Sequence, residues 1–352
     1  MNCTAFSIDL AKNKFQVHGY DERNQRCLVK TLSRAQLLPF FRERPQTTAR
    51  VALEACGGAH AISRQLMALG YQVIQIPTQH VAPFRRGNKN DANDADAIHE
   101  AALRPQLRPV PVKTVEQQDA MLAHLSLERL KKTRLELTNQ MRGVLQERGV
   151  VFPQRPHALR NGVRELLARP LEGELTGRLA EWLLNALAEW AQLEARMAAE
   201  ERVLKRTLAH CELAQRLAEL DGIGIKTATA LTAKVTDPTC FPSARAFAAW
   251  TGNTPREHAS GQQRFLGAIT RRGDTYLRTL FVHGGRSLLQ TALRKQRLER
   301  PLNPLETWLI GVYQRRGYNR AVVAAANKNA RRAWAVLVGR KPNRRPMAQT
   351  LD

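Results

Sequence analysis

Residues 3–20 read CTAFSIDLAKNKFQVHGY, and this stretch decides the fold of the first third of the chain. CTAFSIDLA is a short apolar run typical of a buried strand, and KFQVHGY alternates like a second strand. The turn-rich link DERN at 21–24 signals a hairpin, and QRCLVKTL after it can form a third strand. The sequence therefore predicts a sheet that begins with hairpin strands.

The segments that follow alternate between helix and strand. Ser33 is placed to cap a helix, the glycines at 57–58 make a turn into another, and Thr78 or Asn90 can open the next. The expected elements are the strands RVALE (50–54) and YQVIQIP (71–77) and the helix DANDADAIHEAAL (91–103). This order predicts an α/β domain over residues 1–112, with helices on the faces of a mixed sheet.

The middle of the chain reads as helical. Three prolines in PQLRPVPV (105–112) predict an extended linker. Amphipathic patterns then predict one long helix over about 114–148 and a second over about 174–210. We interpret residues 113–212 as an antiparallel coiled-coil arm with a role in dimer contact. A plain helical connector is the alternative.

The last third, residues 213–340, is expected to be helical. LAELDGIGIKTATALTAKV (217–235) has the form of a helix-hairpin-helix, whose glycine-rich turn lets backbone N–H groups meet a phosphate at a helix N-terminus. A helical hairpin without a ligand is equally compatible. Short helices and polar loops should follow, with Ser243 as a helix cap, and residues 341–352 should be a disordered basic tail. The fold class is therefore α/β plus all-α.

The net charge points to a polyanionic partner. The chain carries 55 Lys and Arg against 31 Asp and Glu, a formal charge of +24, and residues 262–352 alone hold 19 basic against 4 acidic residues. Such a field favours nucleic acid, and binding should weaken steeply with salt. Membrane association is disfavoured because no run of about 18 apolar residues occurs. The 5 cysteines are scattered without a CxxC pair, so we expect no disulfide framework or zinc site and a reducing cytoplasm.

Four acidic residues stand out by position. Asp9 lies inside the apolar strand SIDLA, where an unpaired charge is costly to bury, and Glu54 ends the strand VALE. Asp91 and Asp94 lie three apart on a predicted helix and share one face, whereas Asp96 points elsewhere. Carboxylates are the ligands that Mg²⁺ or Mn²⁺ prefers. A pair of such ions stabilises both the attacking and the leaving oxygen of a phosphoryl transfer.

Each of these acids also has a purely structural interpretation. Glu54 can cap the helix after it, Asp91 can be the N-cap of its own helix, and Asp94 can favour the helix dipole. Asp9 is the hardest to explain in this way. The joint pattern on a strongly basic chain favours a ribonuclease-H-like metal site.

Several motifs, in order along roughly residues 3–340, resemble the DEDD transposases of the IS110 insertion-sequence family. They are SIDLAKNKFQVHGYD, ALEACGGAHAISRQL and GNKNDANDADAIHEA in the N-terminal third, and LDGIGIKTATAL, FAAWTGNTPREHASG, LGAITRRGDTYLRTLFVHGG and ANKNARRAWAVLV in the C-terminal half. The resemblance implies a RuvC-like domain whose acidic residues fall on Asp9, Glu54, Asp91 and Asp94. Gly87 stands where a serine is common in that family.

The resemblance also implies an unusual nucleophile, a C-terminal serine that forms a covalent phosphoserine link to DNA. The serine of HASG falls at Ser260, in a loop rich in Gly, Asn and Thr before a basic segment. A serine needs a base or a metal to take its proton. From the residues alone, Ser260 can equally be a turn residue before Gly261.

Basic residues around this loop and the GIG turn are candidates for phosphate recognition, because the planar guanidinium suits phosphate geometry. They are Lys226, Arg264, Arg271, Arg272 and Arg278. A solvated basic face is the alternative. We expect Asp274 to orient one of the arginines. The family resemblance further implies a non-coding guide RNA that pairs with donor and target DNA.

We therefore expect a transposase that uses Mg²⁺ or Mn²⁺, binds double-stranded donor and target DNA together with a guide RNA, and acts as a dimer or tetramer. One alternative is a Holliday-junction-type nuclease that uses the same carboxylates with water in place of Ser260. The other is a non-enzymatic nucleic-acid-binding protein.

Overall fold

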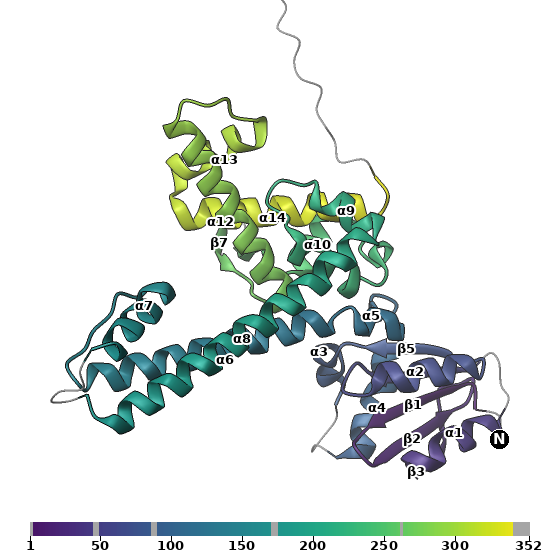
Figure 1. Cartoon of the computed structure of the whole chain (residues 1–352). Helices are drawn as coiled ribbons and strands as arrows, with labels where there is room; N and C mark the ends of the chain where they lie inside the picture. The colour runs from purple at the N-terminus through teal and green to yellow at the C-terminus, as the bar shows by residue number, and fades with distance from the viewer. Residues whose placement is uncertain (1–2, 45–48, 86–89, 170–174, 261–262, 341–352) are drawn as a thin grey trace, which may run out of the picture. The chain divides into compact units, whose positions relative to one another are not determined.

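The structure is a computed structural model that describes residues 3–44, 49–85, 90–169, 175–260 and 263–340. The chain divides into two compact units, Met1–Gln117 and Gln118–Asp352 (Figure 1). Gly87 and the predicted tail over 341–352 lie outside the described residues. Within the described ranges, no helix is both long enough and apolar enough to cross a membrane.

The first unit is built on a five-stranded mixed sheet with strand order β3-β2-β1-β4-β5. β1 pairs antiparallel with β2 and parallel with β4, and β4 pairs parallel with β5. The strands are β1 (Ala5–Leu10), β2 (Lys14–Tyr20), β3 (Arg26–Ser33), β4 (Arg50–Glu54) and β5 (Gln72–Ile76). Every strand expected from the sequence is confirmed, as is the mixed sheet, which is consistent with a ribonuclease-H-like domain.

Helices cover both faces of this sheet. Side chains alternate along each strand, so Phe6 and Ile8 of β1 join the apolar cluster under α1 (Arg34–Arg42) and α2 (Ala59–Ala68). The opposite face packs against α4 (Asp91–Ala102) through a second cluster that includes Ala52 and Ile98. The short helices α3 (Thr78–Val81) and η1 (Ala82–Phe84) precede α4. Polar side chains of β1 and β4 that point toward α4 therefore share one face.

The predicted starts of two helices are also confirmed. Ser33 is the N-cap of α1, and its backbone N–H donates to Gln36 Oε1 at 2.9 Å. Asn90 is the N-cap of α4, where its side chain accepts from the Asn93 N–H at 2.7 Å. The structural interpretation of Asp91 as the N-cap is therefore wrong, because Asn90 already fills that position.

Two long helices dominate the first part of the second unit, as expected. α6 (Leu122–Gln146) and α8 (Gly177–Ala209) lie side by side (Figure 1) and bury Trp190 between them. The prediction of one helix from 114 to 148 is wrong. α5 (Val115–Asp119) ends before α6 begins. Between them the Met121 N–H donates to the Gln118 carbonyl, three residues back, so the α-helical hydrogen-bond pattern is interrupted. No glycine or proline marks this position in the sequence.

A further helix, α7 (Pro156–Leu167), lies between the two predicted long helices, in a stretch for which the sequence predicts no element. Pro156 occupies the first turn of α7, a position where proline starts a helix rather than ending one. Leu159 and Val163 of α7 pack into the same apolar cluster as α6 and α8.

The C-terminal part is not the expected run of short helices and polar loops. β6 (Pro255–Ser260) and β7 (Gln263–Ile269) form an antiparallel two-stranded sheet, and α12 (Thr275–Arg297) is 23 residues long. The remaining elements are α9 (Glu212–Ala218), α10 (Ile225–Lys234), η2 (Pro238–Cys240), α11 (Ala244–Trp250), α13 (Pro304–Arg316) and α14 (Tyr318–Leu337). Ser243 is the N-cap of α11, as predicted.

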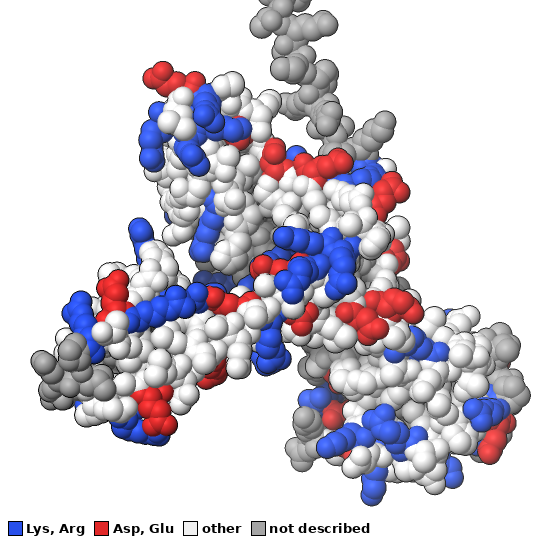
Figure 2. Space-filling model, viewed as in Figure 1, with Lys and Arg blue, Asp and Glu red and all other residues white. Residues whose placement is uncertain are grey.

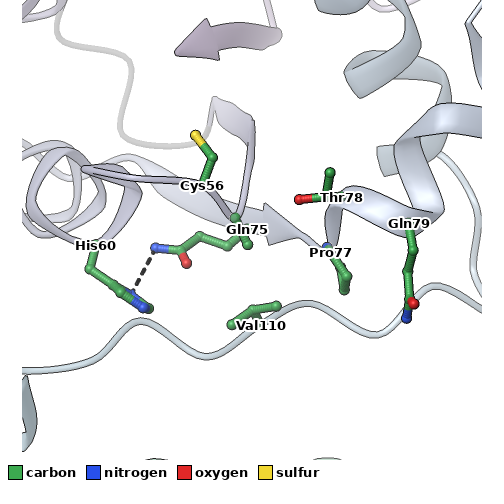
Figure 3. A pocket seen from close by; sticks show the side chains of 8 residues that line it. Cys56, His60, Gln75, Pro77, Thr78, Gln79 and Val110 are labelled. Atoms are coloured by element: carbon green, nitrogen blue, oxygen red, sulfur yellow. Dashed lines mark hydrogen bonds between the residues drawn. The ribbon is translucent and has the colours of Figure 1, made fainter. Parts of the chain in front are cut away.

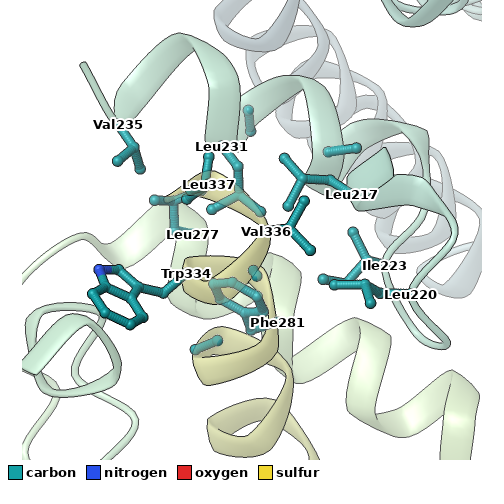
Figure 4. Close-up of a cluster of buried hydrophobic side chains, with 14 of the residues drawn as sticks. Leu217, Leu220, Ile223, Leu231, Val235, Leu277, Phe281, Trp334, Val336 and Leu337 are labelled. Carbon is teal, nitrogen blue, oxygen red and sulfur yellow. The ribbon is translucent and has the colours of Figure 1, made fainter. Parts of the chain in front are cut away.

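The core of this part includes two apolar clusters, and in the one drawn in Figure 4 α12 and α14 meet α9 and α10. Phe281 of α12 is fully buried in this cluster, which also holds Val336 of α14 and Leu217 of α9 (Figure 4). The predicted helix-hairpin-helix is present as α9 and α10. The backbone of its turn passes close to α12, because a Cβ on Gly222 would lie 3.0 Å from the Gly284 carbonyl oxygen, while Asp221 and Gly224 are exposed.

We predict that Gly284→Ala destabilises the second unit by about 1–3 kcal/mol, because a Cβ would lie 1.9 Å from the Gly222 carbonyl oxygen and two backbones must separate. Gly143→Ala in α6 is the matched control. A Cβ there meets no described atom within 4 Å, so helix propensity alone should raise stability by about 0.5–1 kcal/mol. Urea unfolding of both variants measures the difference, and equal effects of the same sign would contradict the close packing.

Candidate active site

The four predicted carboxylates come from three elements of the first unit. Asp9 is in β1, and Glu54 is the last residue of β4, the parallel neighbour of β1. The register pairs Ile8 with Leu53, so Asp9 and Glu54 are the next residues along the two strands. α4 carries the other two acids in its first turn.

All four lie on the side of the sheet that α4 covers, two of them on strands and two on α4 itself. Ile8 and Leu53 point into the cluster under α1 and α2, so the alternation of side chains sends Asp9 and Glu54 toward α4. The strand order and the helix position thus bring together the acids that the sequence singled out.

The pKa of Asp9 reflects its closeness to the other three acids. Burial raises the pKa of the Asp9 carboxyl, and the negative charges of Asp94, Asp91 and Glu54 add to this effect, so that the pKa lies at about 6. Arg85 lowers the pKa of Asp9, but it does not cancel these effects. The face therefore carries more negative charge than its protein environment neutralises.

Arg85 was not anticipated from the sequence. Its Nε donates to Asp94 Oδ1 in an ion pair, and the Asp94 side chain is 13% exposed. Two adjacent arginines at 85–86 before the acidic helix were the available signal. Arg85 thus supplies one positive charge to the acidic face.

The donor set suits a divalent cation in kind and in charge. All four side chains offer hard carboxylate oxygens. These carboxylates repel one another, and a bound divalent cation would offset that repulsion. In the ranges that the structure describes, no three Asp, Glu, His or Cys side chains are drawn together tightly enough to hold an ion. Arg85 makes an ion pair with Asp94.

Asp96 is engaged elsewhere, as expected. Its carboxylate accepts from Tyr20 Oη at 2.8 Å and Arg26 at 2.7 Å, and it lies 2.7 Å from Nδ1 of the buried His18. Burial alone would raise the pKa of Asp96, but the hydrogen bonds from Tyr20 and His18 outweigh burial and lower it. Asp96 therefore ties α4 to β2 and β3 and fixes the helix that carries Asp91 and Asp94.

Ser260, the candidate nucleophile, belongs to the second unit. It is the last residue of β6, pairs with Gln263 of β7 and is exposed. The expectation of an irregular loop is wrong, because the residues on either side of 261–262 pair as a hairpin. Every residue of β6 is exposed, and so is Phe265 of β7, at 69%.

The predicted phosphate-binding residues differ in their surroundings. Lys226 makes an ion pair with Glu201 at 2.7 Å, and Arg278 donates to the Arg271 carbonyl at 2.9 Å. Arg272 is exposed, and Arg264 lies in β7. Figure 2 shows Lys and Arg gathered over the region where α8 meets α10, with acidic side chains beside them.

Asp274 does not orient an arginine. Its carboxylate caps α12 by accepting from the Leu277 N–H at 2.8 Å, and it pairs with Lys234 at 2.5 Å. In the sequence RRGD two arginines are close to Asp274 along the chain, but in the fold the partner of Asp274 is Lys234 of α10.

Comparisons with known proteins place these observations in a family. A model described as "Transposase", for the DEDD domain of IS110-type enzymes, matches residues 6–149. A second, described as "Transposase IS116/IS110/IS902 family", matches residues 214–299. The two matches cover the acidic face and the hairpin with Ser260, respectively.

Curated relatives match over nearly the whole chain. A probable family 20 transposase of Pseudomonas aeruginosa is 41% identical over 96% of this chain and 97% of its own length. The transposase for insertion sequence element IS1111A of Coxiella burnetii is 37% identical over 94% of this chain and 88% of its own. That for element IS1328 of Yersinia enterocolitica is 38% identical over 95% and 97%. The chain belongs to the IS110/IS116/IS902 family of transposases with a DEDD N-terminal domain, DNA phosphoryl-transfer enzymes that move insertion sequences.

Proposed function

We propose that Asp9, Glu54, Asp91 and Asp94 hold Mg²⁺ or Mn²⁺, and that Ser260 is the nucleophile that attacks a DNA phosphate. The observation that carries the metal assignment is the grouping of the four acids where β1, β4 and the first turn of α4 meet, and the raised pKa of Asp9 agrees with it. A DEDD transposase uses a divalent metal in general, and this face is where the chain concentrates negative charge.

The acids would serve as ligands and the cation would stabilise the charge that develops on the reacting phosphate. Asp9 and Glu54 offer rigid positions because both lie on paired strands. Asp91 and Asp94 are positioned by α4, which Asp96 anchors to the sheet. Arg85 neutralises Asp94 until a cation competes for the same carboxylate.

In the serine step, Oγ of Ser260 forms a bond to phosphorus as the bond from phosphorus to one deoxyribose oxygen breaks. A base takes the serine proton, and the released deoxyribose oxygen takes up a proton to become a hydroxyl. Exposure of Ser260 at the end of β6 leaves Oγ accessible to a phosphate. Arg264, Arg271 and Arg272 near the same hairpin, with Lys226 and Arg278, would bind the DNA backbone.

The proposed partners follow from charge and surface. A formal charge of +24 suits donor and target DNA together with a guide RNA, handled in the cytoplasm. The arm formed by α6 and α8 exposes large apolar side chains, which supports its proposed role in a dimer or tetramer. They are Leu122, Leu125, Leu135 and Leu184, each more than half exposed.

A Holliday-junction-type nuclease remains the second candidate. The four acids belong to the first unit and Ser260 to the second, so the acidic face could act on DNA with water as the nucleophile. The serine and water mechanisms differ in whether protein becomes linked to DNA.

We predict that Asp9→Asn raises the thermal stability of the metal-free protein and abolishes transposition. Below the unfolded pKa of 3.8 Asp9 is protonated in both states, and stability is lost as the pH rises through the folded value of about 6. At pH 7 the neutral amide should therefore stabilise the fold by about 1–3 kcal/mol. Melting in EDTA and then in Mg²⁺ should show a Mg²⁺-dependent rise only in the parent.

Asp96→Asn is the matched control for that experiment. The pKa of Asp96 is lowered, so its charged form is favoured by the fold, and the amide should destabilise. Stabilisation by both substitutions, or a Mg²⁺ response that survives Asp9→Asn, would count against the metal site.

We also predict that Mg²⁺ binding releases a proton below neutral pH. Because the pKa of Asp9 is about 6, the apparent affinity should rise by about tenfold per unit below that value and level off above pH 7. Calorimetric titration in buffers of different ionisation enthalpy measures the proton count. A pH-independent affinity between 5 and 7 would show that Asp9 is not a ligand.

The serine mechanism predicts a covalent protein–DNA adduct that survives denaturing electrophoresis. Labelled donor and target DNA with Mg²⁺ should yield this band from the parent and from Ser287→Ala, an exposed serine of α12. Ser260→Ala should lose the band completely. Metal-dependent cutting without an adduct, unchanged in Ser260→Ala, would favour the water-using nuclease.

A further inference from the structure

A cavity of about 450 Å³ opens at the carboxyl ends of β4 and β5 in the first unit. Figure 3 shows Gln75 reaching from the end of β5 toward His60 of α2, with Pro77 and Val110 along the other side. Ligands of open sheets with parallel strands bind outside these carboxyl ends. Nothing in the proposed metal site or the serine step uses this cavity.

The cavity shares a strand end with the acidic face. Its wall includes Ala55 and Cys56, the two residues directly after Glu54. The Cys56 backbone N–H donates to the Glu54 carbonyl oxygen at 2.9 Å, so a tight turn joins the cavity wall to the strand end that carries Glu54. Gln75 alternates with Ile74 and Ile76 of the α4 side, which places it on the α2 side of the sheet.

Gln75 carries a buried acceptor that lacks a hydrogen-bond partner. The residue is 1% exposed and lines the cavity, and its Oε1 accepts no hydrogen bond from any described residue. Its Nε2 is engaged, because it donates to Ser63 Oγ at 2.8 Å and lies 3.3 Å from His60 Nδ1. A buried oxygen in this condition costs free energy until a donor reaches it.

His60 offers the complementary group. Its Nδ1 accepts the Lys113 backbone N–H at 3.2 Å, so the hydrogen of the neutral ring sits on Nε2. Burial lowers the pKa of His60, and the cations Lys113 and Arg64 lower it further, which keeps the ring neutral at pH 7. The cavity thus combines an acceptor and a donor on adjacent side chains.

The remaining lining selects an uncharged, partly flat ligand. Apart from the neutral His60, the cavity wall holds only amide, hydroxyl, thiol and apolar side chains. A phosphate would find no cation in this wall, whereas a heterocycle with N–H and C=O groups would satisfy both Gln75 and His60. A volume of about 450 Å³ lies in the range of small-ligand sites, in which a few placed polar groups fix the orientation of the ligand.

We propose that this cavity receives an unpaired nucleobase next to the phosphate that the acidic face would act on, with Gln75 Oε1 and His60 as the groups that recognise its edge. The inference rests on the proposed function, because Glu54 joins the two sites through the Glu54–Cys56 turn. An unpaired base is available from melted DNA or from single-stranded RNA, and both present the same edge chemistry.

Cys56 provides a reporter that requires no substitution. Its alkylation by a maleimide is measured by peptide mass spectrometry with single-stranded DNA or RNA oligonucleotides in EDTA, and with abasic oligonucleotides that keep every phosphate. Base-bearing strands should slow the reaction of Cys56 at least threefold, and abasic strands should leave it unchanged. Cys211 of the second unit, also half-buried, is the internal control. Protection by DNA only or by RNA only identifies the source of the base.

Equal protection by abasic strands would overturn the proposal, because phosphate rather than base would then fill the cavity. Bound strands that leave Cys56 fully reactive would also overturn it. Gln75→Leu, which keeps the bulk of the side chain, should remove the base-dependent protection. The Mg²⁺-dependent rise in melting temperature should persist in Gln75→Leu, so failure of the cavity and failure of the metal site are separable, and the same melt shows whether the variant folds.

Discussion

The parallel pairing of β1 with β4 is the interaction on which the rest of the first unit depends. Four register pairs, from Ala5 with Arg50 to Ile8 with Leu53, align two strands that are about 40 residues apart in the sequence. This alignment places Asp9 beside Glu54 and sends both toward α4. A slip of one residue would turn every side chain to the other face and move Asp9 into the apolar cluster with Phe6 and Ile8. Hydrophobic burial on that side therefore fixes the position of the acids.

Most of the first unit could be predicted from the sequence. The features that could be predicted depend on local sequence patterns, and those that could not depend on contacts between residues that are apart in the sequence. The strands followed from apolar runs and alternation, and the grouping of the acids followed from strand ends and a three-residue helix spacing. Arg85 was missed because its ion pair with Asp94 depends on how the chain enters α4, which no periodicity encodes. The His18–Asp96 contact joins residues 78 apart and was equally invisible.

In the second unit, too, helices with a regular apolar spacing could be predicted from the sequence, and other elements could not. Leucine and tryptophan spacing predicted α6 and α8, but α7 was hidden because Pro156 reads as a break when it is a helix start. The hairpin of β6 and β7 was hidden because its strands bury almost nothing, so their sequence carries no alternation of apolar and polar residues. Net charge likewise gave the class of partner but not the contacts, since Lys226 and Lys234 are each held by an acidic side chain.

The placement of the acids along the chain has a consequence for biosynthesis. Asp9 and Glu54 lie on strands β1 and β4 and are synthesised early, whereas Asp91 and Asp94 lie on α4, which is synthesised after all five strands of the sheet. A nascent chain that ends before residue 91 can bury the core under α1 and α2 without meeting the repulsion of the full acidic set. In such a chain the repulsion among the acids would be added only when α4 joins the sheet. We therefore expect hydrophobic burial to precede the electrostatic cost, with the acidic face completed last.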